Sequence, residues 1–145
     1  MPPRFIKNFV ISFIVVFAFT AVYHNVLLAS EYQQRLKPVA PLDASGNPAA
    51  DVQGFILSIV VTALGYAWFV PAAGAGNRLY LLHGAIMGLA TIGTFTFLAH
   101  ALVRGWDMWL TGSDFFFGLL TGLIMGGIFM FTEPKAKELA QSART

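Results

Sequence analysis

The residues of this sequence that could carry chemistry are mostly histidines, threonines and carboxylates near the ends of apolar stretches. Two histidines, His24 and His100, each follow a threonine by four residues, at Thr20 and Thr96. On a helix this spacing puts the members of each pair on neighbouring turns of one face. Imidazole and hydroxyl groups there can form hydrogen bonds, pass protons or bind a metal ion within a membrane.

Four carboxylates lie near these pairs in the sequence, and we expect them to gather at the same rim of the protein. They are Glu31, Asp51, Asp107 and Asp114. Together with the histidines and threonines they could bind a cation, shuttle protons, or flank a haem or metal ion held by His24 and His100. The alternative is that each histidine only bonds a neighbouring helix and stabilises packing. The sequence leaves these alternatives open, and the cofactor, if any, is unknown.

The composition is typical of a membrane protein. Hydrophobic residues make up 57% of the chain and charged residues 11%, whereas a soluble domain is about a quarter charged. A net charge of +2 gives no support for a nucleic acid partner. The absence of cysteine excludes disulfides, thiol catalysis and cysteine metal sites. No motif of a serine hydrolase, a zinc protease or a phosphate-binding loop is present, so we do not expect an enzyme.

Four stretches without charged residues are long enough to cross a bilayer, which takes ~20 apolar residues. We expect helices at about 8–29, 52–71, 79–103 and 114–132, an outer loop at 30–51 and a tail at 133–145. Asp51 and Asp114 would cap the helices that follow them. The chain, 1–145, is therefore predicted to be one all-α domain, an integral membrane four-helix bundle with no acid or base inside its spans.

Two parts of the chain align without gaps and suggest an internal repeat. The segments Phe19–His24 and Phe95–His100 both begin Phe-Thr and end in histidine. We predict two tandem helical hairpins in the same orientation, related by an axis along the membrane normal, although coincidence in an apolar sequence is the alternative. The histidine pairs would then face each other. The corresponding positions are Thr20 and Thr96, His24 and His100, Glu31 and Asp107, and Asp51 and Asp114.

Glycines spaced by four residues mark two of the expected spans. Gly118, Gly122 and Gly126 lie in the last span, and Gly84 and Gly88 lie in the third. Small residues at this spacing let two helix backbones approach closely in a membrane. The pattern does not separate contacts within one chain from contacts between chains. We therefore expect, besides the lipid bilayer, either a homo-oligomer or other membrane protein subunits as partners.

The distribution of basic residues predicts the orientation of the chain. Six lysines and arginines lie in the N-terminus, the second connection and the tail, against three in the other two connections. Positively charged loops remain in the cytoplasm. We therefore expect a multi-pass protein of the bacterial inner membrane with both termini cytoplasmic.

The sequence also resembles a family of small, uncharacterised bacterial four-helix membrane proteins, a domain of unknown function. The resemblance extends from the first helix to the fourth. It depends on stretch 17–36 with Tyr32, on Pro71, on Gly84 and Gly88, and on stretch 94–118 with Trp106, Asp114 and Gly118. The family carries an acid in its first helix and another in its third, and Thr20 and Thr96 stand at those places here. The resemblance implies the fold and supplies no function.

Three classes of function are compatible with these features. The first is an interaction or scaffold protein, acting as an accessory subunit of a membrane complex, which the glycine spacing favours. The second is a small oligomeric transporter or channel, which the repeat and the acidic rim favour. The third is a haem- or metal-binding redox protein that uses His24 and His100.

Overall fold

The computed structural model describes residues 3–49, 51–73 and 77–133. Within these ranges the chain is helical apart from its connections and one isolated bridge between Leu42 and Pro48. The elements are α1 (Pro3–Val22), the π-helical turn η1 (Tyr23–Leu27), α2 (Ala29–Leu36), α3 (Val52–Phe69), the 3-10 turn η2 (Pro71–Ala73), α4 (Asn77–Gly88), the π-helical turn η3 (Leu89–Gly93), α5 (Thr94–Leu102) and α6 (Met108–Thr132).

Four helical stretches are long and apolar enough to cross a membrane. They are Pro3–Leu27, Val52–Phe69, Arg78–Leu102 and Met108–Thr132. The first joins α1 to η1, and the third joins α4, η3 and α5. Large apolar side chains are exposed along them, as a lipid-facing surface requires, with Leu102 80% and Phe131 83% exposed. The predicted all-α membrane fold is therefore confirmed.

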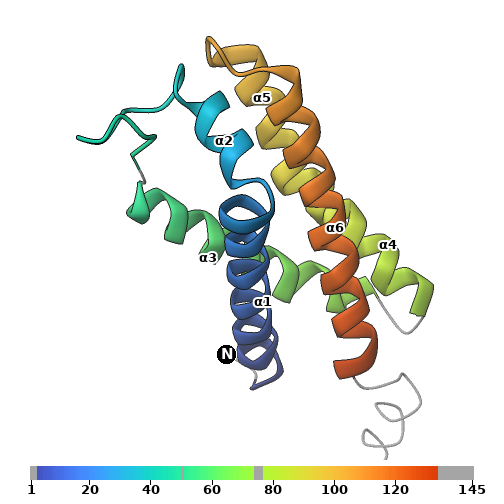
Figure 1. Cartoon of the computed structure of the whole chain (residues 1–145). Helices are drawn as coiled ribbons and strands as arrows, with labels where there is room; N and C mark the ends of the chain where they lie inside the picture. Colours follow the sequence, from blue (N-terminus) through green and yellow to red (C-terminus); the bar gives the residue numbers. More distant parts are fainter. Residues whose placement is uncertain (1–2, 50, 74–76, 134–145) are drawn as a thin grey trace, which may run out of the picture.

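The two halves of the chain pack in different ways. The span formed by α4 and α5 runs beside α6, whereas α3 crosses α1 obliquely (Figure 1). The start of α1 and the end of α6 lie at the same end of the molecule, where Arg4 pairs with Glu133 and Lys7 Nζ donates to the Thr132 carbonyl at 3.0 Å. We call this the terminal end. The opposite, loop end carries α2 and the connection between α5 and α6.

The glycines of α4 and α6 lie where the two helices touch. A Cβ added to Gly84 would overlap the carbonyl oxygen of Gly122, and one added to Gly88 would overlap that of Gly118. A Cβ on Gly126 would overlap a backbone carbonyl of α4 in the same way. Only glycine allows this approach, so the contact within one chain uses the five glycines that the spacing singled out.

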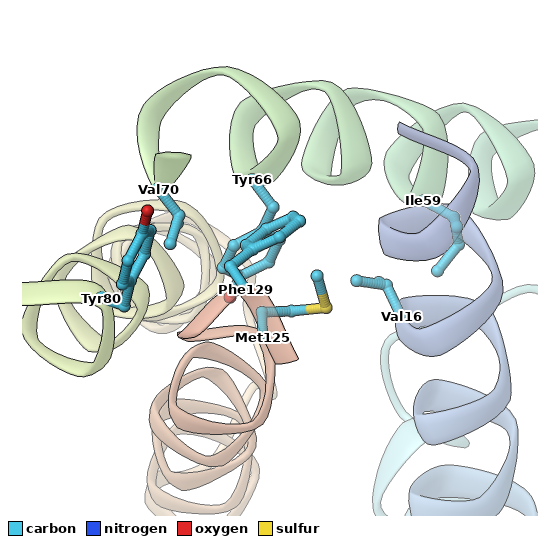
Figure 2. Packing of buried hydrophobic residues seen from close by; sticks show 7 residues of the cluster. All are labelled: Val16, Ile59, Tyr66, Val70, Tyr80, Met125 and Phe129. Carbon is cyan, nitrogen blue, oxygen red and sulfur yellow. The ribbon is translucent and has the colours of Figure 1, made fainter. Parts of the chain in front are cut away.

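Two clusters of buried side chains form the core. Toward the terminal end, the first cluster joins α1, α3, α4 and α6, and Figure 2 shows Met125 of α6 between Phe129 and Val16. Its members are Val16, Ile59, Tyr66, Val70, Tyr80, Met125 and Phe129. Toward the loop end, the second cluster consists of Tyr23, Tyr32, Leu110 and Phe117. This second cluster holds α2 against α6 and so positions the side chains of the candidate site.

Three expected boundaries are wrong. The first helix begins at Pro3 and not near residue 8, and the outer loop expected at 30–51 begins with the helix α2, Ala29–Leu36. The last span does not begin at Asp114, because Asp107 caps it by accepting a hydrogen bond from the Leu110 amide at 2.8 Å. Gly112 lies within α6 and does not interrupt it. Asp114 therefore lies inside a spanning helix, and the expectation of spans without a charged residue is wrong as well. The matching expectation for Asp51 is confirmed, since its side chain accepts from the Gly54 amide at 3.0 Å.

The loop between α2 and α3 is irregular but contains an ordered turn. Asp43 Oδ1 accepts hydrogen bonds from the backbone amides of Ser45 and Asn47, both at 2.9 Å. Gly46 in this turn has a φ of 77°, a conformation that suits glycine. The predicted tail lies outside the described residues from position 134 onward.

Candidate functional site

The first span ends at the loop end of the molecule with two polar side chains, Thr20 and His24, and that of His24 is directed toward α6. Thr20 Oγ1 donates to the Val16 carbonyl at 2.7 Å, and His24 Nδ1 lies 3.1 Å from the Thr20 carbonyl. His24 belongs to η1, where the helix widens before it ends at Leu28. The other ring nitrogen, His24 Nε2, is therefore directed away from its own helix.

That nitrogen meets the carboxylate inside α6. His24 Nε2 lies 3.3 Å from Asp114 Oδ1, and the Tyr32 hydroxyl donates to the same oxygen. Asp114 is only 7% exposed. A buried carboxylate in a membrane span is costly unless it is hydrogen-bonded or its charge is balanced. Here the neighbouring elements η1 and α2 provide both partners, although His24 and Tyr32 lie 90 and 82 residues from Asp114 in the chain.

The hydrogen-bond partners of His24 limit the ways in which it can share a proton with Asp114. A carbonyl oxygen can only accept, so His24 Nδ1 must carry the proton that it donates to the Thr20 carbonyl. A neutral imidazole with its proton on Nδ1 has an acceptor at Nε2, which would face a carboxylate acceptor. The contact is favourable only with a further proton between His24 and Asp114. This contact can therefore carry one proton, either on the imidazole or on the carboxylate.

Two tyrosines and a serine complete the hydrogen-bond network. The Tyr23 hydroxyl lies 3.0 Å from Ser113 Oγ and donates to the Ser113 carbonyl at 3.1 Å. The Tyr32 hydroxyl lies 3.2 Å from the same Oγ. Burial raises the pKa of the Tyr32 phenol, and the nearby Asp114 carboxylate raises it further. Tyr32 therefore remains a hydrogen-bond donor to Asp114 over the physiological range of pH.

Aromatic rings surround His24 on three sides. The ring centroids of Tyr32 and Phe117 each lie 4.7 Å from that of His24, and that of Tyr23 lies at 5.2 Å, all edge to face. Such contacts restrict the rotation of the imidazole. His24 therefore holds one orientation, with Nε2 toward Asp114.

The pair forms part of the wall between two cavities. The first, of about 440 Å³, is reached from the loop end and includes the polar side chains of Asn25 and Gln33 in its lining. The second, of about 780 Å³, lies between α1, α3 and the α4–α5 span and extends down to Val16. Thr20, His24, Phe55 and Asp114 line both cavities. A molecule or an ion entering either space would meet the same carboxylate.

An ion network at the rim fastens α2 to the start of α6. Arg35 bridges Glu31 at 3.2 Å and Asp107 at 2.6 Å, and its guanidinium lies 4.7 Å from the centroid of the Trp109 ring. The hydrogen bond from the Leu110 amide lowers the pKa of Asp107, and Arg35 lowers it further. The pair between Arg35 and Asp107 thus connects α2 to the start of α6, and Glu31 orients Arg35 from within α2.

The other predicted site residues are distributed unevenly. Asp51, besides capping α3, lines the second cavity with Thr20, His24 and Asp114. Thr96 is buried and donates to the Thr111 carbonyl of α6 at 3.4 Å, and His100 is exposed with Nδ1 3.1 Å from the Trp106 carbonyl. Thr96 and His100 line neither cavity. The structure thus pairs His24 with Asp114 and does not bring His100 to it.

A metal ion would need more ligands than these residues offer. Within the described ranges, no group of three or more histidines and carboxylates lies close enough to hold one. Both ring nitrogens of His24 already have partners, Thr20 and Asp114.

The sequence interpretation missed the residues that orient the pair. Tyr32 was named only within the family resemblance, and Tyr23 and Ser113 were not singled out. The resemblance included Tyr32 and Asp114 among its matching positions, and this was the one available signal. Their separation of 82 residues in sequence conceals the hydrogen bond between them.

Comparison with known proteins gives one match. The family described as predicted membrane protein (DUF2177) matches residues 5–131, from the first turn of α1 almost to the end of α6. No curated protein and no solved structure matches the chain. The matched range includes every residue of the network around Asp114.

Proposed function

The chain belongs to this family of predicted membrane proteins, and we propose that it is a small carrier that exchanges a proton for an organic cation at His24 and Asp114. The observation that carries the proposal is the contact between these two side chains in the wall shared by two cavities. Of the predicted classes of function, this contact favours a transporter.

Charge balance supplies the mechanism of exchange. With one proton between them, His24 and Asp114 have no net charge, whether the proton is on the imidazole or on the carboxylate. Loss of that proton leaves one negative charge on a carboxylate that is only 7% exposed, which is unfavourable in a membrane span. A cation beside Asp114 restores neutrality equally well. Binding of the cation and binding of the proton therefore exclude each other.

The walls of the cavities are suited to an organic cation. Tyr32 and Trp106 line the first cavity, Phe95 and Phe117 line the second, and Phe55 lines both. A cation over an aromatic ring gains about 0.5–2 kcal/mol. Both volumes, about 440 and 780 Å³, fall in the range of sites for small molecules.

Calorimetry with two ions of similar shape and opposite charge tests this proposal. The protein in lipid nanodiscs is titrated with tetraphenylphosphonium and, separately, with tetraphenylborate, and empty nanodiscs correct for partition into lipid. We expect saturable binding of the cation alone. Titration in buffers of different ionisation enthalpy should reveal about one proton released for each cation bound, because the pair holds one exchangeable proton.

Two matched variants decide whether Asp114 is responsible. Asp114→Asn should abolish saturable cation binding and proton release. Asp43→Asn removes a carboxylate from the exposed loop turn, outside both cavities, and should change neither. Equal binding of the two ions, or cation binding that survives in Asp114→Asn, would show that the site does not exchange protons for cations.

The other predicted roles have no specific contact in their favour. A scaffold or accessory role and a homo-oligomer stay predictions, and mass spectrometry of the protein purified in mild detergent tests both. The haem prediction is tested by the absorption spectrum, in which a Soret band lost in His24→Ala would support it.

A further inference from the structure

The terminal half of α1 buries polar side chains that the site at the loop end does not use. The only residues of α1 that are fully buried are Asn8, Ser12 and Val16, at 1%, 0% and 2% exposure. Neither Asn8 Oδ1 nor Ser12 Oγ has a hydrogen-bond partner among the described residues. Buried polar groups in membrane and soluble proteins are nearly always paired, and where protein does not pair them, ordered water does.

These residues continue a line that leads to the candidate site. Asn8, Ser12, Val16, Thr20 and His24 follow one another at intervals of four. Neighbours in such a line lie ~6 Å apart along the axis, and the line winds around the helix by about 40° at each step. The second cavity lies against the last three of them. Val16 is the only member of the line without a polar group.

At the terminal end the line arrives beside a buried acid. Glu133 is only 6% exposed, pairs with Arg4 and lies 3.3 Å from Lys7 Nζ. Arg4 and Lys7 belong to the turns of α1 that precede and include Asn8. The Glu133 atom that faces Lys7 is Oε1, so both carboxylate oxygens of Glu133 have a cationic partner. Groups that can pair with water thus lie on both sides of a single apolar layer.

That layer is the part of the core around Val16. Figure 2 shows Val16 of α1, Ile59 of α3 and Met125 of α6 pointing toward one another. Val16 and Ile59 also line the second cavity, so this layer is where that cavity ends. Apolar constrictions of this kind close a pore by excluding water.

We propose that Asn8 and Ser12 line a water-filled proton path from the second cavity to the terminal end, and that Val16, Ile59 and Met125 are its gate. A proton leaving His24 and Asp114 crosses the second cavity and passes through hydrogen-bonded water beside Ser12 and Asn8 when the gate is hydrated. The loop-end cavity gives access from the opposite side. The inference deepens the proposed function, since it provides the transmembrane route for the exchanged proton.

Proton flux into liposomes tests the gate. Purified variants are reconstituted in phosphatidylcholine vesicles that contain a pH-sensitive dye, and a potassium gradient with valinomycin drives protons inward. Val16→Ser places a hydroxyl in the apolar layer and should raise the flux by roughly tenfold over the unmodified protein. Val10→Ser is the matched control on the same helix, because Val10 is 47% exposed and faces away from the core. It should leave the flux unchanged.

A second variant tests the route beyond the gate. Adding Asn8→Leu to Val16→Ser should abolish the extra flux, because it removes the polar group that leads out of the membrane. If Val16→Ser does not remain monodisperse in detergent, Val16→Ala replaces it. Equal flux in the variants at positions 16 and 10, or a leak unaffected by Asn8→Leu, would overturn the path.

The results also separate this inference from the proposed function. A proton leak in Val16→Ser without any tetraphenylphosphonium binding supports the path and contradicts the cation carrier. Cation binding that depends on Asp114, with no leak in Val16→Ser, supports the carrier and contradicts the path.

Discussion

At the scale of single residues, the Tyr32 hydroxyl connects α2 to the carboxylate inside α6. It donates to Asp114 Oδ1, the oxygen that also faces His24. A hydrogen bond to a charged group contributes about 1.5–3 kcal/mol. We therefore expect Tyr32→Phe to lower the free energy of unfolding by about 2 kcal/mol, measured by denaturation in mixed detergent micelles.

Tyr66→Phe is the matched control for that measurement. Tyr66 is also buried, but its hydroxyl has no hydrogen-bond partner among the described residues. We expect its substitution to have little effect. Equal losses for the two variants would mean that the bond to Asp114 does not contribute to stability.

Asp107 should make stability depend on pH in the acidic range. Its pKa in the folded protein lies below the ordinary 3.8, because the Leu110 amide and Arg35 both stabilise the carboxylate. A carboxylate whose pKa is lowered by folding stabilises the folded state at pH values above its pKa in the unfolded chain. This stabilisation is lost as the pH falls through its pKa in the folded protein. The melting temperature should therefore fall as the pH is lowered below the ordinary pKa of 3.8.

Asp107→Asn isolates this contribution from that of the other acids. Asparagine still accepts the capping hydrogen bond but has no charge. The difference in melting temperature between the protein and this variant should be largest near neutral pH and should shrink as the pH is lowered. A difference that does not change with pH would contradict the assignment.

At residue scale, the sequence identified His24, Thr20, Asp51 and Asp114 as candidates but could not pair them. The partner of a buried side chain is decided by helix packing. Tyr32 and His24 are 82 and 90 residues from Asp114 along the chain. The histidines were paired by an apparent repeat, whereas His24 meets an acid of α6.

At the scale of the elements, α4 and α6 are held together by direct contact of their backbones. A Cβ on Gly126 would overlap the Tyr80 carbonyl and lie 2.9 Å from Leu81 Cα. Such overpacking costs about 1–3 kcal/mol. We expect Gly126→Ala to lower the unfolding free energy by that amount, measured by the same denaturation assay.

The neighbouring glycine provides an internal control. A Cβ on Gly127 would meet no atom within 4 Å. Alanine is also the better helix former, by about 0.8–1 kcal/mol. Gly127→Ala should therefore be neutral or slightly stabilising. A loss of stability as large as that of Gly126→Ala would mean that helix contact is not the reason for these glycines.

The helical spans themselves were predictable because lipid requires long apolar stretches. The start of α6 was not predictable, because Asp114 was taken to mark the boundary of the last span. That rule assumes that a carboxylate in a membrane has no partner, and η1 and α2 supply two for Asp114. The two π-helical turns, η1 and η3, were also not predictable, since their residues are ordinary helix formers.

At the scale of the whole molecule, the two ends of the bundle should be exposed on opposite sides of the membrane. The sequence has no cysteine, so a maleimide would label only a cysteine that is introduced by substitution. Ser45→Cys lies at the loop end and Pro3→Cys at the terminal end. A maleimide that cannot cross membranes should label only the first in intact cells and both after lysis. Labelling of both in intact cells would contradict the four crossings or the predicted cytoplasmic termini.

The position of Asp114 along α6 would also make the proposed proton site sensitive to transmembrane voltage. Met108 starts this 25-residue helix, and Asp114 follows it by about 9 Å of the helix length of about 37 Å, at 1.5 Å per residue. A proton that reaches the pair from the loop end therefore crosses about a quarter of the electric field. One charge crossing 100 mV changes in energy by about 2.3 kcal/mol, so a quarter of the field amounts to about 0.6 kcal/mol. Energising the membrane would shift the occupancy of the pair by about two- to threefold, which links the exchange of ions to the electrical state of the cell.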